Sequence, residues 1–93
     1  MRVYISGPMT GIVDWNRPLF QRVAGDLRRG GHSVIDPTEN GLPMEAPRAD
    51  HLRADIGDLL DCDAILMLPG WEDSAGATLE HSIAVALGLE VLS

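Results

Sequence analysis

Two carboxylates on different predicted helices are the side chains best suited to chemistry. Glu80 lies in the stretch GATLEHSIA, and a helical wheel at 100° per residue places it at the centre of an apolar stripe. The other members of that stripe are Gly76, Ala77, Ile83, Ala84 and Leu87. Glutamate is almost never fully buried without a partner. Glu80 is therefore either a functional carboxylate or a structural one that bonds a neighbouring backbone group or an arginine.

Asp55 borders the apolar face of the preceding helix, close to the N-terminus of that helix. Asp58 and Asp61 point nearly opposite that face and are expected to be solvated. Two carboxylates that converge on one cleft suit glycosidic chemistry, because one can attack while the other positions or protonates the substrate. The alternative for Asp55 is a boundary residue paired with an arginine such as Arg48 or Arg2.

Composition excludes several other kinds of chemistry. The 93 residues carry a formal net charge of −7, and all seven basic residues are arginines, which removes every lysine-based mechanism. An acidic chain with two tryptophans, one tyrosine and one phenylalanine is a poor match for a nucleic acid polymer. The single cysteine and three scattered histidines lack metal-ligand spacing, so neither a metal nor a cofactor is expected.

No apolar segment approaches the roughly 20 residues that a membrane span needs, and the N-terminal apolar run is too short for a signal peptide. The sequence therefore predicts a cytoplasmic protein without membrane contact.

Apolar runs alternate with helical stripes along the chain. Strands are expected over residues 3–5, 32–36, 64–68 and 89–92, and helices over residues 16–29, 48–61 and 75–87. The order β-α-β-α-β-α-β predicts a small doubly wound (flavodoxin/Rossmann-like) three-layer α/β sandwich with a four-stranded parallel sheet. One domain, 1–93, accounts for the whole chain.

Two local details follow from the same patterns. Asp14 or Asn16 is expected to cap the first helix. The apolar face of the second helix is expected to contain Leu52, Ile56, Leu59 and Leu60.

Ligands of such sheets bind outside the carboxyl ends of the strands, where loops 6–16, 36–47 and 69–77 gather. The first loop, SGPMTG, is rich in small residues, so its backbone N–H groups could approach a phosphate or sugar closely. Taken alone, this loop is equally consistent with a plain turn. Trp71 in the third loop could wall a base-binding pocket, cover a hydrophobic edge, or pack at a subunit contact.

Taken together, these residues resemble the nucleoside 2-deoxyribosyltransferase-like superfamily, especially its short bacterial and phage branch. The resemblance covers nearly the whole chain and is carried by VYISGPMTG, GGHSVIDP and RADIGDLLDCDAILMLPGWEDSAGATLEHSIAVALGLEV. It implies cleavage or transfer of the N-glycosidic bond of a (deoxy)nucleoside or nucleotide. It also implies a homodimer or a larger homo-oligomer.

The resemblance also implies roles for single residues. Glu80, which ends a Gly-x-x-x-Glu segment, would attack the anomeric carbon, Asp55 would hold the sugar or assist, and Tyr4 would orient Glu80. Together with the loop positions, the expected substrate-binding residues are Ser6, Gly7, Pro8, Gly11, Asp36, Trp71, Ser74 and Gly76.

Two departures from the superfamily pattern keep other functions open. The transferases recognise the base with an aspartate six residues before the nucleophile, where this chain has Ser74, with Asp73 one residue earlier. The transferases also continue beyond the fourth strand. The alternative function is a non-catalytic nucleotide-binding or sequestering module of the same fold. A flavodoxin-like electron carrier fits less well, because the chain is short and poor in aromatic residues.

Overall fold

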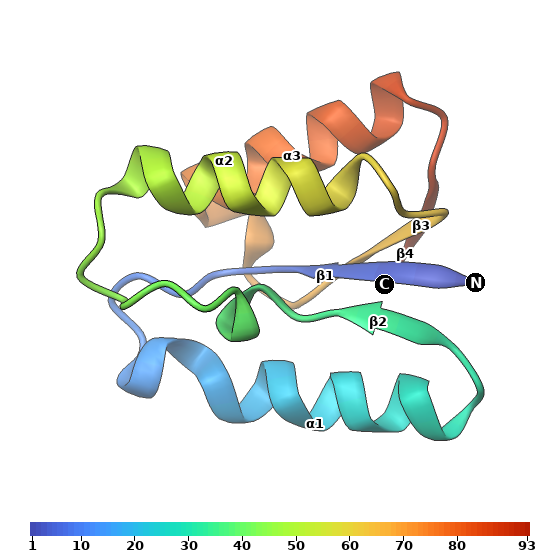
Figure 1. Ribbon diagram of the computed structural model, residues 1–93, viewed down its shortest axis with the longest axis horizontal. Coiled ribbons are helices and arrows are strands. Elements are labelled where there is room, and N and C mark those ends of the chain that lie inside the picture. Colours follow the sequence, from blue (N-terminus) through green and yellow to red (C-terminus); the bar gives the residue numbers. More distant parts are fainter.

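The computed structural model describes residues 1–93 and places one parallel sheet between two layers of helices (Figure 1). The strands are β1 (Arg2–Ser6), β2 (Ser33–Ile35), β3 (Ala64–Met67) and β4 (Glu90–Leu92). The helices are α1 (Arg17–Arg29), α2 (Arg48–Leu59) and α3 (Ala75–Ala86). The strand order is β2-β1-β3-β4, and every pairing is parallel. The predicted fold class is confirmed.

The two faces of the sheet carry different helices, as Figure 1 shows. Helix α1 covers one face, and α2 and α3 lie together on the other. Two short 3₁₀ turns, η2 (Pro37–Glu39) and η3 (Trp71–Asp73), lie in the loops that follow β2 and β3. The turn in the loop after β1, η1 (Val13–Asn16), is left-handed, because Asp14, Trp15 and Asn16 have positive φ. No helix is both long and apolar enough to cross a bilayer.

Strand β1 lies between β2 and β3 and is the centre of the core. Its side chains alternate between the two faces, as the pleat of a strand requires. Ile5 packs with Phe20 and Ala24 on the α1 side, whereas Tyr4 packs with Leu59 and other residues on the α2/α3 side. Because Ser6 is two residues after Tyr4, its side chain points to the α2/α3 side as well.

The expected capping of α1 by Asp14 or Asn16 is wrong. Asn16 occupies the capping position, but its backbone is left-handed (φ 60°) and its side chain makes no capping hydrogen bond. A capping side chain normally needs an extended backbone to reach the first free N–H groups of the helix. The Asn16 amide instead donates to the backbone carbonyl of Pro8 at 3.0 Å.

Two leucines expected in apolar stripes are instead exposed. Leu60 is 57% exposed and Leu87 is 50% exposed. Each occupies the C-cap position directly after the last residue of its helix, with the backbone still in the right-handed helical region. Asp61 is exposed as expected, whereas Asp58 is half-buried.

Gly7, directly after β1, is a place where the fold needs the absence of a side chain. A Cβ atom at Gly7 would lie 2.7 Å from Cβ of Leu68, which is too close for any pair of such atoms. Gly57 is the opposite case, because it lies in α2 with open space around it.

We expect Gly7→Ala to lower the free energy of unfolding by about 1–3 kcal/mol through overpacking. Gly57→Ala should raise it by about 0.5–1 kcal/mol, because alanine favours the helix more than glycine does. Urea unfolding followed by circular dichroism measures both. Equal effects of the two substitutions would contradict the close approach at Gly7.

Candidate active site

A cleft of about 840 Å³ opens where the loops after β1, β2 and β3 meet. Its walls come from those three loops, from the cleft-facing side of α2 and from the start of α3. This is the edge at which parallel α/β sheets bind ligands, and the volume lies in the range of small-molecule sites. Glu80 and Asp55 both line this cleft.

The carboxylate of Glu80 is held by two hydroxyl groups from β1. The Tyr4 hydroxyl donates a hydrogen bond to Oε2 at 2.8 Å, and the Ser6 hydroxyl donates one to Oε1 at 2.7 Å. Glu80 is only 6% exposed, and Tyr4 and Ser6 are fully buried. No arginine or backbone group bonds this carboxylate, so the expected structural alternative for Glu80 is not the arrangement found.

Burial raises the pKa of Glu80 from 4.5 to about 7. The hydrogen bonds from Ser6 and Tyr4 oppose this rise, and the negative charge of Asp55 adds to it. The pKa of Tyr4 is raised well above its usual value of 10, first by burial and then by the charge of Glu80. Tyr4 therefore stays a neutral donor at neutral pH, whereas Glu80 is present in both its charged and its neutral form.

Asp55 is 9% exposed and accepts a hydrogen bond from the Asn40 amide, Nδ2 to Oδ1, at 3.2 Å. Asp55 forms no ion pair with Arg48, Arg2 or any other arginine, so the expectation of an arginine partner is wrong. Burial raises the pKa of Asp55, and the hydrogen bond from Asn40 opposes this rise. Because the charge of Asp55 raises the pKa of Glu80, the two carboxylates interact electrostatically across the cleft wall.

The expected substrate-binding residues divide into two groups. Those that line the cleft are Gly7, Pro8, Ser74 and Gly76. Those that lie outside its lining are Ser6, Gly11, Asp36 and Trp71. Ser6 is fully buried beneath the cleft, and its hydroxyl is bonded to Glu80.

Although Ser74 lines the cleft, its hydroxyl has a structural partner. It caps α3 by accepting a hydrogen bond from the backbone N–H of Ala77 at 3.2 Å.

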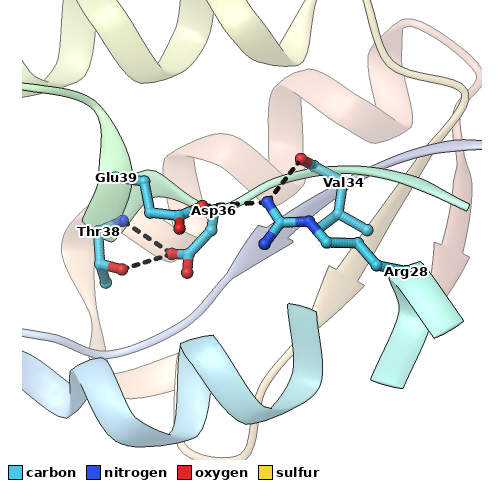
Figure 2. Close-up of polar contacts among 5 residues, drawn as sticks. All are labelled: Arg28, Val34, Asp36, Thr38 and Glu39. Atoms are coloured by element: carbon cyan, nitrogen blue, oxygen red, sulfur yellow. Dashed lines mark hydrogen bonds and ion pairs between the residues drawn. The ribbon is translucent and has the colours of Figure 1, made fainter. Parts of the chain in front are cut away.

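Asp36 is folded back onto its own turn, as Figure 2 shows. One of its oxygens, Oδ1, accepts hydrogen bonds from the N–H of Thr38 at 2.9 Å and from its hydroxyl at 2.7 Å. Burial raises the pKa of Asp36, and the bonds from Thr38 oppose the rise. Glu39 of the same turn pairs with Arg28 of α1 at 3.0 Å, and Arg28 also donates to the carbonyl of Val34 (Figure 2). Asp36 therefore shapes the turn after β2 and does not reach the cleft.

Trp71 packs against the hydrophobic core, as expected for a side chain that covers a hydrophobic edge. Its ring stacks on that of His81, with the ring centroids 4.5 Å apart, and it packs against the core cluster that contains Tyr4. It can fix the position of η3, but it does not wall the cleft.

Sequence reasoning missed several polar residues of the cleft, chiefly Arg48, His51 and Asp73. Arg48, His51 and Asp55 are spaced by three and four residues along α2, which puts them on one face of the helix. That spacing was the available signal, but Arg48 was considered only as a partner for Asp55. Arg48 forms no ion pair, so its guanidinium is free to meet a ligand.

The raised pKa of Glu80 makes stability depend on pH. The folded chain holds a proton on Glu80 up to about pH 7, whereas the unfolded chain releases it near pH 4.5. Glu80 therefore contributes stability below pH 4.5, and this contribution is lost as the pH rises to about 7. The loss is about 3 kcal/mol in all.

We expect Glu80→Gln to remove this part of the pH dependence, because glutamine does not titrate. The measurement is the free energy of urea unfolding between pH 4.5 and 8 for the wild type and the variant. Asp36 and Asp55 titrate in both proteins, so the difference between the two curves reports the titration of Glu80 together with its interaction with Asp55. If the free energy of unfolding depended on pH in the same way in both proteins, the raised pKa of Glu80 would be contradicted.

Comparisons with known proteins agree with this architecture. The chain matches the family model described as a domain of unknown function, DUF4406, over residues 1–93, and no curated protein matches it. The CMP N-glycosidase BcmB of Clostridium botulinum is 18% identical, with a TM-score of 0.69 over 98% of this chain and 66% of that one. The 2-deoxyribosyltransferase of Leishmania mexicana is 23% identical, with a TM-score of 0.77 over 98% of this chain and 61% of that one.

This chain thus spans less than two thirds of the length of both solved structures, and the likeness to them is one of fold. The predicted nucleoside 2-deoxyribosyltransferase-like fold is confirmed by it. The chain belongs to the DUF4406 family and has the fold of this N-glycosidase and this deoxyribosyltransferase.

Proposed function

We propose that the chain cleaves or transfers the N-glycosidic bond of a nucleoside or a nucleoside 5′-monophosphate, with Glu80 as the nucleophile. The observation that carries the proposal is the buried Glu80 carboxylate, which lines the cleft and has each oxygen held by one hydroxyl group. The fold shared with an N-glycosidase and a deoxyribosyltransferase supports the same chemistry.

The hydrogen bonds to Glu80 suit it to nucleophilic attack. A carboxylate held at both oxygens has one orientation, so little rotational freedom is lost when the substrate binds. Each oxygen accepts one hydrogen bond and keeps a second acceptor site. A carboxylate with a pKa of about 7 is also more basic than an ordinary one, which favours attack once it is ionised.

The reaction would proceed in two displacements. An oxygen of ionised Glu80 forms a bond to the anomeric carbon while the bond from that carbon to the base nitrogen breaks. The electron pair of that bond leaves with the base, which takes up a proton. Water, or the nitrogen of a second base, then attacks the anomeric carbon, loses its proton, and releases Glu80 as a carboxylate.

Two neighbouring residues would support these steps. Tyr4 stays neutral and keeps Glu80 oriented in both displacements. Asp55 offers a second carboxylate on the cleft wall, which can accept a hydrogen bond from a sugar hydroxyl. We also propose that residues 1–93 act as one domain and that two or more copies assemble, with the assembly still a prediction from the resemblance.

We expect the wild-type chain to release free base from at least one member of a panel of nucleosides and nucleoside 5′-monophosphates. Glu80→Gln should lower kcat at least about a thousandfold, because it removes the nucleophile. Glu90→Gln, an exposed carboxylate on β4, is the matched control and should keep wild-type activity. Liquid chromatography of the reaction products, with and without a second free base, separates hydrolysis from transfer.

The same experiment decides between the enzyme and a binding module. If calorimetry shows that a nucleotide binds and chromatography recovers it unchanged, the chain is a non-catalytic nucleotide-binding module. Equal activity of the wild type and Glu80→Gln would remove Glu80 from the mechanism.

The position of Arg48 favours a phosphorylated substrate over an unphosphorylated one. It is the one arginine on the cleft wall, where three carboxylates of Asp55, Asp73 and Glu80 also lie. A hydrogen bond from a free guanidinium to a phosphate contributes more than one between neutral groups.

We expect Arg48→Gln to raise KM for nucleoside 5′-monophosphates about tenfold to a hundredfold and to leave KM for nucleosides unchanged. Arg53→Gln is the control on the same helix, because Arg53 is 82% exposed and pairs with Asp50 outside the cleft. Steady-state kinetics with both substrate classes checks this. An equal rise of KM for both classes would mean that Arg48 does not contact phosphate.

A further inference from the structure

Asn40 and His51 join the loop after β2 to α2 through a chain of hydrogen bonds that ends at Asp55. The Asn40 amide nitrogen lies 3.1 Å from His51 Nδ1 and 3.2 Å from Asp55 Oδ1. The Asn40 amide oxygen accepts from the backbone N–H of Leu42 at 3.0 Å. The other ring nitrogen of His51, Nε2, lies 3.0 Å from the carbonyl oxygen of Pro43.

The direction of every bond in this chain can be assigned. The backbone N–H of Leu42 can only donate, so the atom of Asn40 beside it is the amide oxygen. The amide nitrogen then faces His51 and Asp55, and both of its hydrogens are used. Because an amide nitrogen only donates, His51 Nδ1 must accept.

The other end of the imidazole gives the same answer independently. The carbonyl oxygen of Pro43 only accepts, so His51 Nε2 must carry the hydrogen. The two ends together require His51 as the neutral Nε2–H tautomer. The contacts of Nδ1 and Nε2 thus indicate the same tautomer, and neither involves a ligand.

We propose that Asn40 and His51 are positioning residues for Asp55, with His51 fixed as the Nε2–H tautomer. Asn40 is the one side chain that hydrogen-bonds Asp55, and no arginine forms an ion pair with this buried carboxylate. His51 in turn fixes the Asn40 amide, and its bond to Pro43 fastens the loop to α2. One oxygen of Asp55 is thereby held, which sets the direction in which the other can meet a sugar.

The network itself can be tested without any enzymatic activity. We expect long-range ¹H–¹⁵N spectra of the labelled chain, recorded at a pH where the ring is neutral, to show His51 as the Nε2–H tautomer. Asn40→Ala should shift the His51 Nδ1 resonance, because that nitrogen loses its donor. His32, which lies next to the N-terminus of the chain, should not change. An Nδ1–H tautomer, or a His51 spectrum unaffected by Asn40→Ala, would overturn the proposal.

The effect on catalysis rests on the proposed function and is tested separately. Asn40→Ala should lower kcat about tenfold to a hundredfold, as expected when a reacting group is misplaced by about 1 Å. In an Asp55→Ala background, Asn40→Ala should cost less than about twofold more, because it acts through Asp55. If the loss of kcat in the double variant equalled the product of the two single losses, Asn40 would act independently of Asp55. That result would overturn the positioning role.

Two substitutions of His51 provide a test that does not depend on Asn40. His51→Asn keeps an acceptor near the place of Nδ1 and should retain most of kcat, whereas His51→Leu removes it and should lose activity as Asn40→Ala does. His32→Leu is the control for replacing a histidine. Equal activity of His51→Asn and His51→Leu would overturn the proposal.

If the wild type releases no base, the proposed function fails. The measurement of the His51 tautomer then still tests the hydrogen-bond network.

Discussion

The rest of the site depends on the burial of one carboxylate between two hydroxyl groups. Removing Glu80 from water without partners would be costly, and Tyr4 and Ser6 offset that cost by bonding one oxygen each. Both hydroxyls come from one face of β1, so β1 must lie inside the sheet with α3 packed on that face. The central strand and the helix beside it thus fix the position of Glu80 before any ligand is present.

The same central strand shapes the cleft at its carboxyl end. β1 pairs with β2 on one side and β3 on the other, so the loops that follow all three strands meet at one edge. Gly7 lets the chain leave β1 against Leu68, where a larger residue would push the first loop away from the third. The second loop lines the cleft with Pro37, Met44 and Ala46. The contacts of His51 with Asn40 and Pro43 tie this loop to α2. The cleft therefore has walls from three parts of the sequence.

Much of this could be predicted from local patterns, and the rest depended on tertiary contacts. Apolar runs and helical periodicity gave the seven elements and the inward direction of Glu80, because both follow from burial of one face. The partners of Glu80 are 76 and 74 residues away in sequence, so no local pattern points to them. Ser6 looked free to bind substrate, and Asp36 looked open to the cleft, because a sequence does not show which polar groups satisfy each other.

The left-handed run Asp14, Trp15 and Asn16 directly precedes α1 and forms part of the cleft wall. Three consecutive residues other than glycine with positive φ each cost free energy, and they persist only where the surroundings leave no other choice. Trp15 lines the cleft, and Asn16 holds the carbonyl of Pro8. This part of the wall is therefore present in the chain without a ligand, and the energy of its unusual backbone is spent in folding and not in binding.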